Sequence, residues 1–129
     1  MNALNRDLKK LVNFIEKNEK ERVNKDYWRL KFHLMPPVGW LNDPNGLCEF
    51  NGEYHIFYQY SPFDANGGIK LWGHYTSKDF INYKNNGTEI FADQPFDCHG
   101  AYSGSTIVHN GKMNIFYTGN VKHVGEHDY

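Results

Sequence analysis

Two segments of this 129-residue chain repeat one pattern, and this repeat constrains the fold more than any other feature. The segments "FNGEYHIFYQY" (50–60) and "HNGKMNIFYTG" (109–119) each hold an Asn-Gly pair, and Ile-Phe-Tyr begins five residues after each turn asparagine. Asn-Gly between apolar stretches is typical of a tight β-hairpin. Asn51 and Asn110 are about 60 residues apart, and a hairpin that recurs at such a spacing favours the blades of a β-propeller.

Further short strands are expected along the second part of the chain. Tyr, Phe and Trp make up 16% of the residues, and aromatic side chains favour strands. The expected strands cover residues 46–50, 53–60, 71–77, 81–84, 103–108 and 112–118. A propeller needs four or more blades to close its ring. These strands make fewer than two blades, so we expect an all-β fold of which these 129 residues are only a part.

Residues 2–24 are expected to form an amphipathic α-helix. The apolar residues follow the spacing of one helical face, and they are Leu4, Leu8, Leu11, Val12 and Ile15. The charges around them are mixed, which favours packing against a larger body over binding to a membrane surface. We therefore divide the chain into a helical extension with its linker, residues 1–31, and a strand-rich domain, residues 32–129.

Charge and composition exclude several classes of function. The formal net charge is −1 and the isoelectric point is about 6.6, so nothing favours nucleic acid or an anionic membrane as a partner. No stretch is long and apolar enough for a signal peptide or a membrane span, and two cysteines make no disulfide framework. We expect a cytoplasmic protein with free thiols.

Asp43, within "WLNDPNG" (40–46), is the strongest candidate for chemistry. Pro44 biases Asp43 toward extended backbone, and Asn45 and Gly46 tolerate positive φ, so we expect a tight turn. A carboxylate held on such a stiff backbone suits a nucleophile. For these residues taken alone, a simple Asx-turn is the alternative.

Three nearby residues could complete a ligand site around Asp43. Trp40 could stack on a sugar ring, and Asn42 could bind a hydroxyl group. Gln59 interrupts an aromatic strand and needs partners for both ends of its amide, which a polyhydroxylated ligand can supply. Exposure to solvent or bonding to the backbone is the alternative for Gln59.

For the remaining polar residues, structural roles are weighed beside ligand binding and catalysis. His74 shares a strand face with Trp72 and is expected to be a core residue, and Ser103 is expected to bind ligand or to begin a strand. A metal site at residues 97–99 is disfavoured because no second pair of ligands is suitably spaced. Three carboxylates are candidates for a second catalytic acid: Glu89, Asp93 and Asp97.

Four motifs occur in a fixed order: "WLNDPNG" (40–46), "YHIFYQYSP" (54–62), "WGHYTSKDFINY" (72–83) and "AYSGSTIV" (101–108). Together they resemble glycoside hydrolase family 32, which contains invertases, levanases, inulinases and sucrose-6-phosphate hydrolases. The segment "FHLMPPVGWLNDPNGL" (32–47) is especially similar to the family's opening motif. The resemblance extends from residue 32 to about residue 120, and four motifs in order are more specific than any single one. The motif wording favours this family over neighbouring five-bladed families that act on arabinose or xylose chains.

The resemblance implies a five-bladed β-propeller followed by a β-sandwich, with the active site in a funnel at the propeller axis. It implies a retaining β-fructofuranosidase, in which Asp43 attacks C2 of a β-fructofuranoside and forms a covalent fructosyl-enzyme. The positions that match the fructose pocket are Trp40, Leu41, Asn42, Gln59, Trp72, Tyr102 and Ser103. The implied partner is a small sugar, namely sucrose, sucrose 6-phosphate or a fructan, and we expect no cofactor and no metal.

Two motifs of the family are missing from this sequence. The stabilising Asp of an Arg-Asp-Pro motif has no match, since Leu8 follows Arg6-Asp7, and no Glu precedes a Cys to match the acid/base motif. We therefore expect the N-terminal piece of a longer enzyme, inactive as an isolated chain. The alternatives are a non-catalytic carbohydrate-binding remnant and an inactive truncated product. The helix before the opening motif and the missing export signal make the chain similar to the bacterial sucrose-6-phosphate hydrolases.

Overall fold

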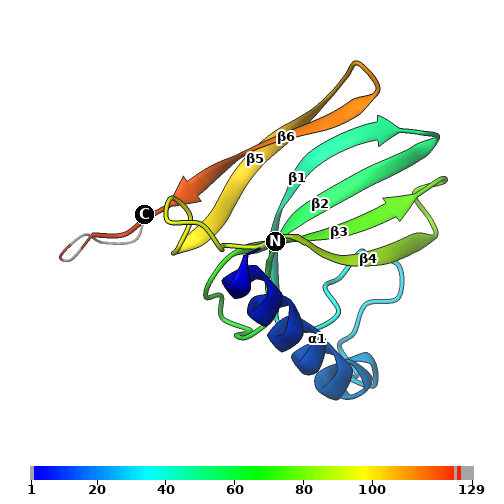
Figure 1. Cartoon of the computed structure of the whole chain (residues 1–129). Helices are drawn as coiled ribbons and strands as arrows, with labels where there is room; N and C mark the ends of the chain where they lie inside the picture. The colour runs from blue at the N-terminus through cyan, green and yellow to red at the C-terminus, as the bar shows by residue number, and fades with distance from the viewer. Residues whose placement is uncertain (1, 124, 126–129) are drawn as a thin grey trace.

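One helix and two antiparallel sheets form the structure, a computed structural model that describes residues 2–123 and 125 (Figure 1). Along the chain the elements are α1 (Ala3–Asn24), β1 (Trp40–Phe50), β2 (Glu53–Ser61), β3 (Leu71–Ser77), β4 (Tyr83–Ile90), β5 (Gly100–His109) and β6 (Lys112–Asn120). Strands β1 to β4 form one sheet in sequence order, and β5 pairs only with β6 among the described strands. The structure is therefore mostly β with a single helix, as the sequence predicts.

Both predicted hairpins are present, and their turns have the expected backbone. Asn51 and Gly52 have φ values of 53° and 76°, and Asn110 and Gly111 have values of 50° and 68°. Positive φ at both central residues is what a type I′ turn requires, and asparagine and glycine adopt it at little cost. These local signals place β1 against β2 and β5 against β6.

Four predicted boundaries differ from the structure, those of the helix, the first strand, the fourth strand and β5. The fourth strand is Tyr83–Ile90 rather than 81–84, because the Asp79 carboxylate accepts hydrogen bonds from the backbone N–H groups of Ile81 and Asn82 and holds them in a turn. The helix begins at Ala3 because the Asn2 side chain caps it. Strand β5 begins at Gly100 instead of residue 103, and the longer β1 is described with the site.

The two faces of the four-stranded sheet are covered by different elements. On one face Tyr58, Tyr60 and Leu71 pack with Val12 of α1, and the Tyr60 hydroxyl donates a hydrogen bond of 2.9 Å to Glu16. On the other face Phe57 and Trp72 pack against the β5–β6 hairpin. Side chains alternate along β2, so one strand supplies both cores.

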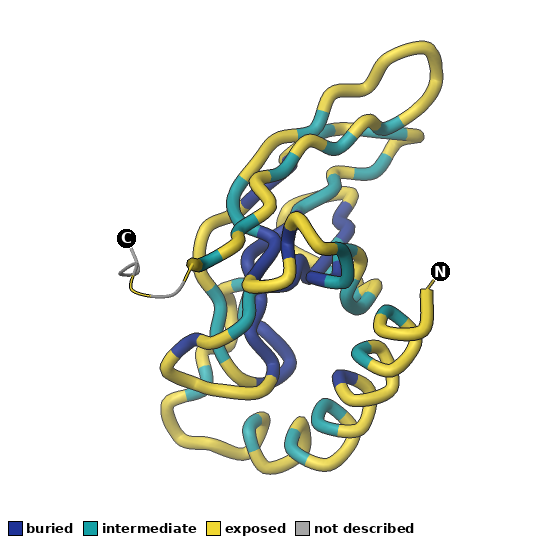
Figure 2. Tube along the Cα trace, turned by 60° about the vertical axis from the view of Figure 1, so that its left-hand side comes forward, coloured by how far each residue is buried: buried dark blue, intermediate teal, exposed yellow. Residues whose placement is uncertain are grey.

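Burial is concentrated where these elements converge, and the outer end of the β5–β6 hairpin is mostly exposed (Figure 2). No helix within residues 2–123 is long and apolar enough to cross a membrane.

Candidate functional site

Asp43 lies within strand β1, so the prediction of a tight turn at residues 42–46 is wrong. Leu41 pairs with Tyr60 and Pro44 pairs with Tyr58, which leaves Asn42 and Asp43 opposite the single residue between those partners, Gln59. The extra residue is a β-bulge, and it bends the strand and re-aims the side chains at that point. The strand accommodates Pro44 because β1 is the edge of its sheet.

Ser103 lies at a second bulge, in strand β5 of the other sheet. Tyr102 pairs with Thr118 and Gly104 pairs with Tyr117, so Ser103 has no partner of its own. Its hydroxyl donates a hydrogen bond of 2.7 Å to Oδ2 of Asp43. The two bulges therefore bring together side chains that are 60 residues apart in the sequence.

Gln59 completes a chain of hydrogen bonds that ends at Asp43. Its side chain is buried, with 5% exposed, and its Nε2 donates to Oγ of Ser103 over 3.2 Å. Because that bond occupies a lone pair of the Ser103 oxygen, the hydroxyl hydrogen is free to point at Asp43. The Asp43 residue itself is exposed, so its carboxylate is held at one oxygen and open to a ligand.

Gly46 permits the close approach of the two sheets behind this site. It has φ +52°, and a Cβ there would lie 2.5 Å from Oγ1 of Thr106 and 3.0 Å from the Phe57 ring. Asn45, beside it, accepts a hydrogen bond of 3.3 Å from the backbone N–H of Gly104. Glycine and asparagine are therefore needed at these positions for contact between the sheets.

Trp72 is placed differently from the other predicted pocket residues. Its side chain is fully buried between the sheets, with ring centroids of Phe57 and Tyr117 at 6.0 and 6.2 Å. Its Nε1 donates a hydrogen bond of 3.1 Å to the carbonyl oxygen of Tyr102. In this structure Trp72 positions strand β5, just before Ser103.

Trp40 and Tyr102 share one cationic neighbour. Nζ of Lys70 lies 5.3 Å from the ring centroid of Trp40 and 5.9 Å from that of Tyr102. Both distances are within the range of a cation–π interaction. Sequence reasoning missed Lys70, since a single lysine before a strand carries no signal of its contacts.

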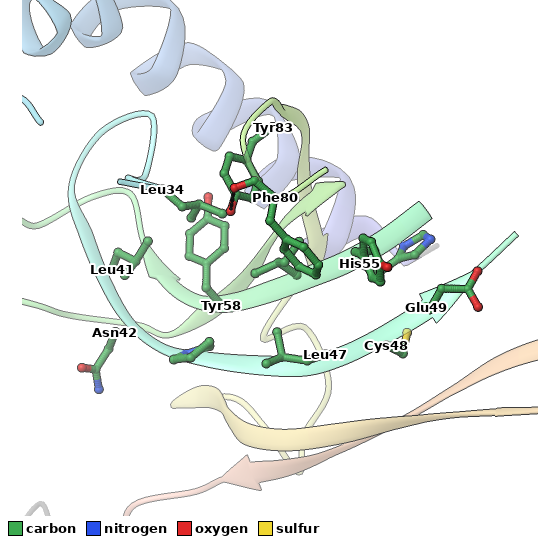
Figure 3. A pocket seen from close by; sticks show the side chains of 13 residues that line it. Leu34, Leu41, Asn42, Leu47, Cys48, Glu49, His55, Tyr58, Phe80 and Tyr83 are labelled. Atoms are coloured by element: carbon green, nitrogen blue, oxygen red, sulfur yellow. Dashed lines mark hydrogen bonds between the residues drawn. The ribbon is translucent and has the colours of Figure 1, made fainter. Parts of the chain in front are cut away.

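Leu41 lines a separate cavity of about 580 Å³, in which Asp43 takes no part; Asn42 borders this cavity, but its side chain points to the opposite side of β1 from Leu41 (Figure 3). The cavity lies beside Tyr58, which faces α1, and Phe80 and Tyr83 are among the residues that line it. Its lining is mostly apolar, and Glu49 is its single carboxylate. Leu41 therefore lies away from the Asp43–Ser103 contact, whereas Gln59 and Ser103 take part in it.

His74 is a buried core residue, as expected, and it is paired with His55. The Nε2 atom of His74 lies 2.9 Å from Nδ1 of His55, and its ring stacks on Phe57 with centroids 4.2 Å apart. Burial, with the nearby His55, lowers the pKa of His74 from 6.5 to about 4. His74 is therefore neutral near pH 7.

Two of the other candidate carboxylates, Asp93 and Asp97, have structural contacts. Asp97 is fully buried and accepts hydrogen bonds of 2.7 Å from the backbone N–H of Gln94 and from the Tyr117 hydroxyl. Asp93 binds the side chain of Asn5 in α1, and Glu89 is exposed on β4. Within residues 2–123 and 125, no group of three or more His, Cys, Asp or Glu residues could hold a metal ion.

The sequence of the domain that contains this site was compared with models of known protein families. The family model of the glycosyl hydrolases family 32 N-terminal domain matches residues 33–129. The chain belongs to glycoside hydrolase family 32. Its bulged β1 strand lies at the start of the matched region, so the Asp43–Ser103 contact is part of the family domain.

Relatives in this family include a sucrose-6-phosphate hydrolase from Bacillus subtilis, 42% identical over 95% of this chain and 26% of the relative. An insoluble-isoenzyme β-fructofuranosidase from Arabidopsis thaliana is 49% identical over 75% of this chain and 17% of the relative. This family 32 chain therefore spans about a quarter of the length of the Bacillus relative and a smaller share of the length of the plant enzyme.

Solved structures of the family superpose well on this one. A sucrose-6-phosphate hydrolase from Lactobacillus gasseri has a TM-score of 0.79 at 39% identity, over 84% of this chain and 22% of that chain. A family 32 β-fructofuranosidase from Bombyx mori has a TM-score of 0.81 at 33% identity, over 92% of this chain and 25% of that chain. The family 32 fold therefore holds for most of the residues described.

Proposed function

We propose that this chain forms the first part of the catalytic domain of a retaining β-fructofuranosidase that cleaves sucrose 6-phosphate or sucrose. The observation that carries the proposal is the hydrogen bond from Ser103 to Asp43, braced by Gln59 and made between two bulged strands. Bulges beside active sites commonly re-aim side chains. The Asp43 carboxylate is exposed, and a hydrogen bond to one of its oxygens fixes its orientation. Such a carboxylate is suited to nucleophilic attack by its second oxygen.

The proposed fold of the complete domain is a five-bladed β-propeller. A blade is a four-stranded antiparallel sheet, and the sheet β1–β2–β3–β4 has that order. The β5–β6 hairpin then begins the second blade, packed on the first through Trp72 and Ala101. In this arrangement residues 1–31 are an extension, of which α1 covers part of the first blade.

In the proposed reaction an oxygen of Asp43 forms a bond to C2 of the fructosyl unit while the bond from C2 to the leaving-group oxygen breaks. The leaving oxygen takes up a proton from a general acid. Water then attacks C2 and gives its proton back to the same acid/base group, the bond to Asp43 breaks, and free fructose is released. Ser103 and Gln59 orient the Asp43 carboxylate, and Trp40, Asn42 and Tyr102 are the proposed sugar contacts.

The acid and the transition-state-stabilising carboxylate are not matched by the family motifs in this sequence. General acid catalysis typically contributes about 10²–10⁴-fold. We therefore propose that the 129-residue chain by itself does not hydrolyse sucrose at an enzymatic rate. Of the candidate carboxylates inside the chain, Asp93 and Asp97 have structural partners, and Glu89 is exposed on β4, at the opposite edge of the sheet from β1.

The test uses a chimaera of residues 1–129 with the segment that follows the matched region in the Bacillus subtilis relative. Hydrolysis of sucrose 6-phosphate and of sucrose is measured for the chimaera and for its Asp43→Asn variant. Loss of a covalent nucleophile lowers kcat by orders of magnitude, so we expect a fall of about 10³-fold or more for both substrates.

Asp7→Asn, which changes an exposed aspartate of α1, is the matched control and is expected to keep full activity. Acid quenching and peptide mass analysis should find a fructosyl adduct on the peptide that contains Asp43. Activity of Asp43→Asn within about tenfold of the parent, or an adduct on a different residue, would exclude Asp43 as the nucleophile.

A further inference from the structure

A polar hollow of about 440 Å³ lies beside the proposed sugar site, outside every residue assigned above to catalysis. Its lining brings together three separate segments: the loop between β2 and β3, the residues before β5, and the residues after β6. The lining residues are Asn66, Gly68, Ile69, Lys70, Cys98, His99 and Lys122. Three of the seven are lysine or histidine, so the hollow is rich in hydrogen-bond donors that can carry positive charge.

Lys70 connects this hollow to the proposed sugar site. Its carbonyl oxygen accepts a hydrogen bond of 2.8 Å from the backbone N–H of Ala101, which fixes it at the start of β5. Its Nζ lies near the rings of both Trp40 and Tyr102. One face of the Lys70 ammonium therefore borders the aromatic walls that begin the two bulged strands.

His99 is held in an orientation that favours donation from its outer nitrogen. Its Nδ1 accepts a hydrogen bond of 2.9 Å from the backbone N–H of Lys122, and its own backbone N–H donates to Asn120 over 3.1 Å. When Nδ1 accepts, the hydrogen of the neutral imidazole is on Nε2. The same contacts bring the chain after β6 against the loop before β5, which places Lys122 on the wall of the hollow.

None of the seven residues that line the hollow in the described part of the chain is an aspartate or a glutamate. Asp97, next to Cys98 in the sequence, is fully buried, and its two oxygens accept hydrogen bonds from Gln94 and Tyr117. Oδ1 of Asp64 accepts a hydrogen bond of 2.8 Å from the backbone N–H of Asn66 within its own loop. An anion that enters the hollow therefore meets lysine and histidine donors and no carboxylate among the lining residues.

We propose that this hollow binds the phosphate group of a phosphorylated sugar whose fructosyl unit lies at Asp43. The inference rests on the proposed function. It attributes to this hollow the selectivity of the same site for a sugar phosphate over the free sugar. Charge-assisted hydrogen bonds from lysine and histidine suit the oxygens of a phosphate monoester. The phosphate belongs to the leaving sugar, which extends from the fructosyl unit past the Trp40–Tyr102 walls toward Lys70.

The first test compares two substrates on the chimaera described above. The measured quantity is the ratio of kcat/KM for sucrose 6-phosphate to kcat/KM for sucrose. Lys70→Met and Lys122→Met keep the length of the side chain and remove its charge. Each is expected to lower the ratio at least tenfold, chiefly through a higher KM for the phosphorylated substrate. Lys112→Met, at the far end of β6, is the control and is expected to leave the ratio unchanged.

The second test needs no catalysis and uses the 129-residue chain. Amide NMR spectra are recorded with glucose 6-phosphate, with glucose and with inorganic phosphate. We expect glucose 6-phosphate to shift the signals of residues around Lys70 and His99, and the shifts to shrink as salt screens the charges. Shifts with inorganic phosphate of the same size would identify a general anion site rather than a sugar-phosphate site, which would overturn the proposal.

The outcomes separate this inference from the proposed function. If Asp43→Asn abolishes both activities but Lys70→Met and Lys122→Met leave the substrate ratio unchanged, the phosphate site is wrong and the nucleophile stands. If the ratio falls but Asp43→Asn stays active, the hollow is correct and Asp43 is not the nucleophile. Absence of saturable shifts with glucose 6-phosphate, together with an unchanged ratio, would rule out the hollow.

Discussion

Individual residues at the two bulges decide the geometry of the site. Asp43 and Ser103 each occupy an extra position in a strand, and this re-aims both side chains toward the contact between the sheets. Gln59 is buried and reaches the contact through Ser103. Asp43 was predicted as a nucleophile, and Gln59 and Ser103 as ligand contacts, but the hydrogen bonds between them depend on the bulges and could not be predicted from the sequence spacing.

Gly46 offers a sharp test of the contact between the sheets. Gly46→Ala adds a Cβ that collides with Thr106 and Phe57 and also places alanine at positive φ. We expect a loss of about 2–4 kcal/mol in the free energy of unfolding, the sum of a backbone cost and an overpacking cost. Chemical denaturation of the 129-residue chain would measure it.

Gly111→Ala is the matched control for this change. Gly111 also has positive φ, at 68°, but no atom lies within 4 Å of its added Cβ. Only the backbone cost of about 1 kcal/mol is expected there. Equal losses for the two variants would show that the packing around Gly46 does not limit the approach of the sheets.

At the scale of elements, α1 and the sheet are joined through a small set of contacts. Val12 is the one buried residue of the helix, and Glu16 accepts the hydrogen bond from Tyr60. The helix was predicted from its apolar spacing, and Leu8, Val12 and Ile15 of the predicted face pack toward the sheet, whereas Leu4 and Leu11 are exposed. The strand that it covers could not be predicted, because an amphipathic face indicates burial without naming its partner.

Removing side-chain volume at Val12 tests this contact. Val12→Ala is expected to lower the free energy of unfolding by about 2 kcal/mol, because two buried methyl groups are lost and a cavity is left. Leu11→Ala, at a position 53% exposed on the same helix, is expected to cost less than about 1 kcal/mol. Thermal and denaturant unfolding measure both variants, and equal costs would contradict the packing of α1 described here.

The His55–His74 pair between β2 and β3 predicts how stability depends on pH. The pKa of His74 is lowered to about 4 in the fold, whereas an unfolded histidine titrates near 6.5. The unfolded chain therefore binds more protons between these values, and stability is lost as pH falls from about 6.5 to 4. After allowance for solvent screening, the loss is on the order of 2 kcal/mol.

The change His74→Gln should flatten this pH dependence, while His109→Gln, an exposed position on β5, should retain it. Denaturant unfolding between pH 4 and pH 7 provides the measurement. An unchanged slope in His74→Gln would assign the acid sensitivity to other groups.

At the scale of the whole molecule, the β5–β6 hairpin leaves apolar surface and a strand edge exposed. Strand β6 pairs only with β5 among the described strands, and Phe116 is 62% exposed on it. An exposed edge with apolar side chains is a template for association. In the proposed propeller, further strands of the second blade would cover this edge.

Concentration-dependent association of the 129-residue chain is the expected consequence. Phe116→Lys should reduce it, because a charge on an edge strand opposes pairing between copies. Phe14→Lys changes a side chain of α1 that is 64% exposed and is expected to have little effect. Light scattering coupled to size exclusion would measure the mass, and an equal effect of both variants would point away from the β6 edge.

The sequence by itself determined the elements that depend on local chemistry. The Asn-Gly turns, the amphipathic helix and the four ordered motifs were sufficient for the hairpins, α1 and the family, since each signal lies within a few residues. Only the tertiary structure decided that residues 42–46 continue a strand, that Trp72 is enclosed between the sheets, and that Lys70 lies beside Trp40 and Tyr102. Those features depend on bulges and on the packing of one sheet against another, and a pattern along a single strand does not specify them.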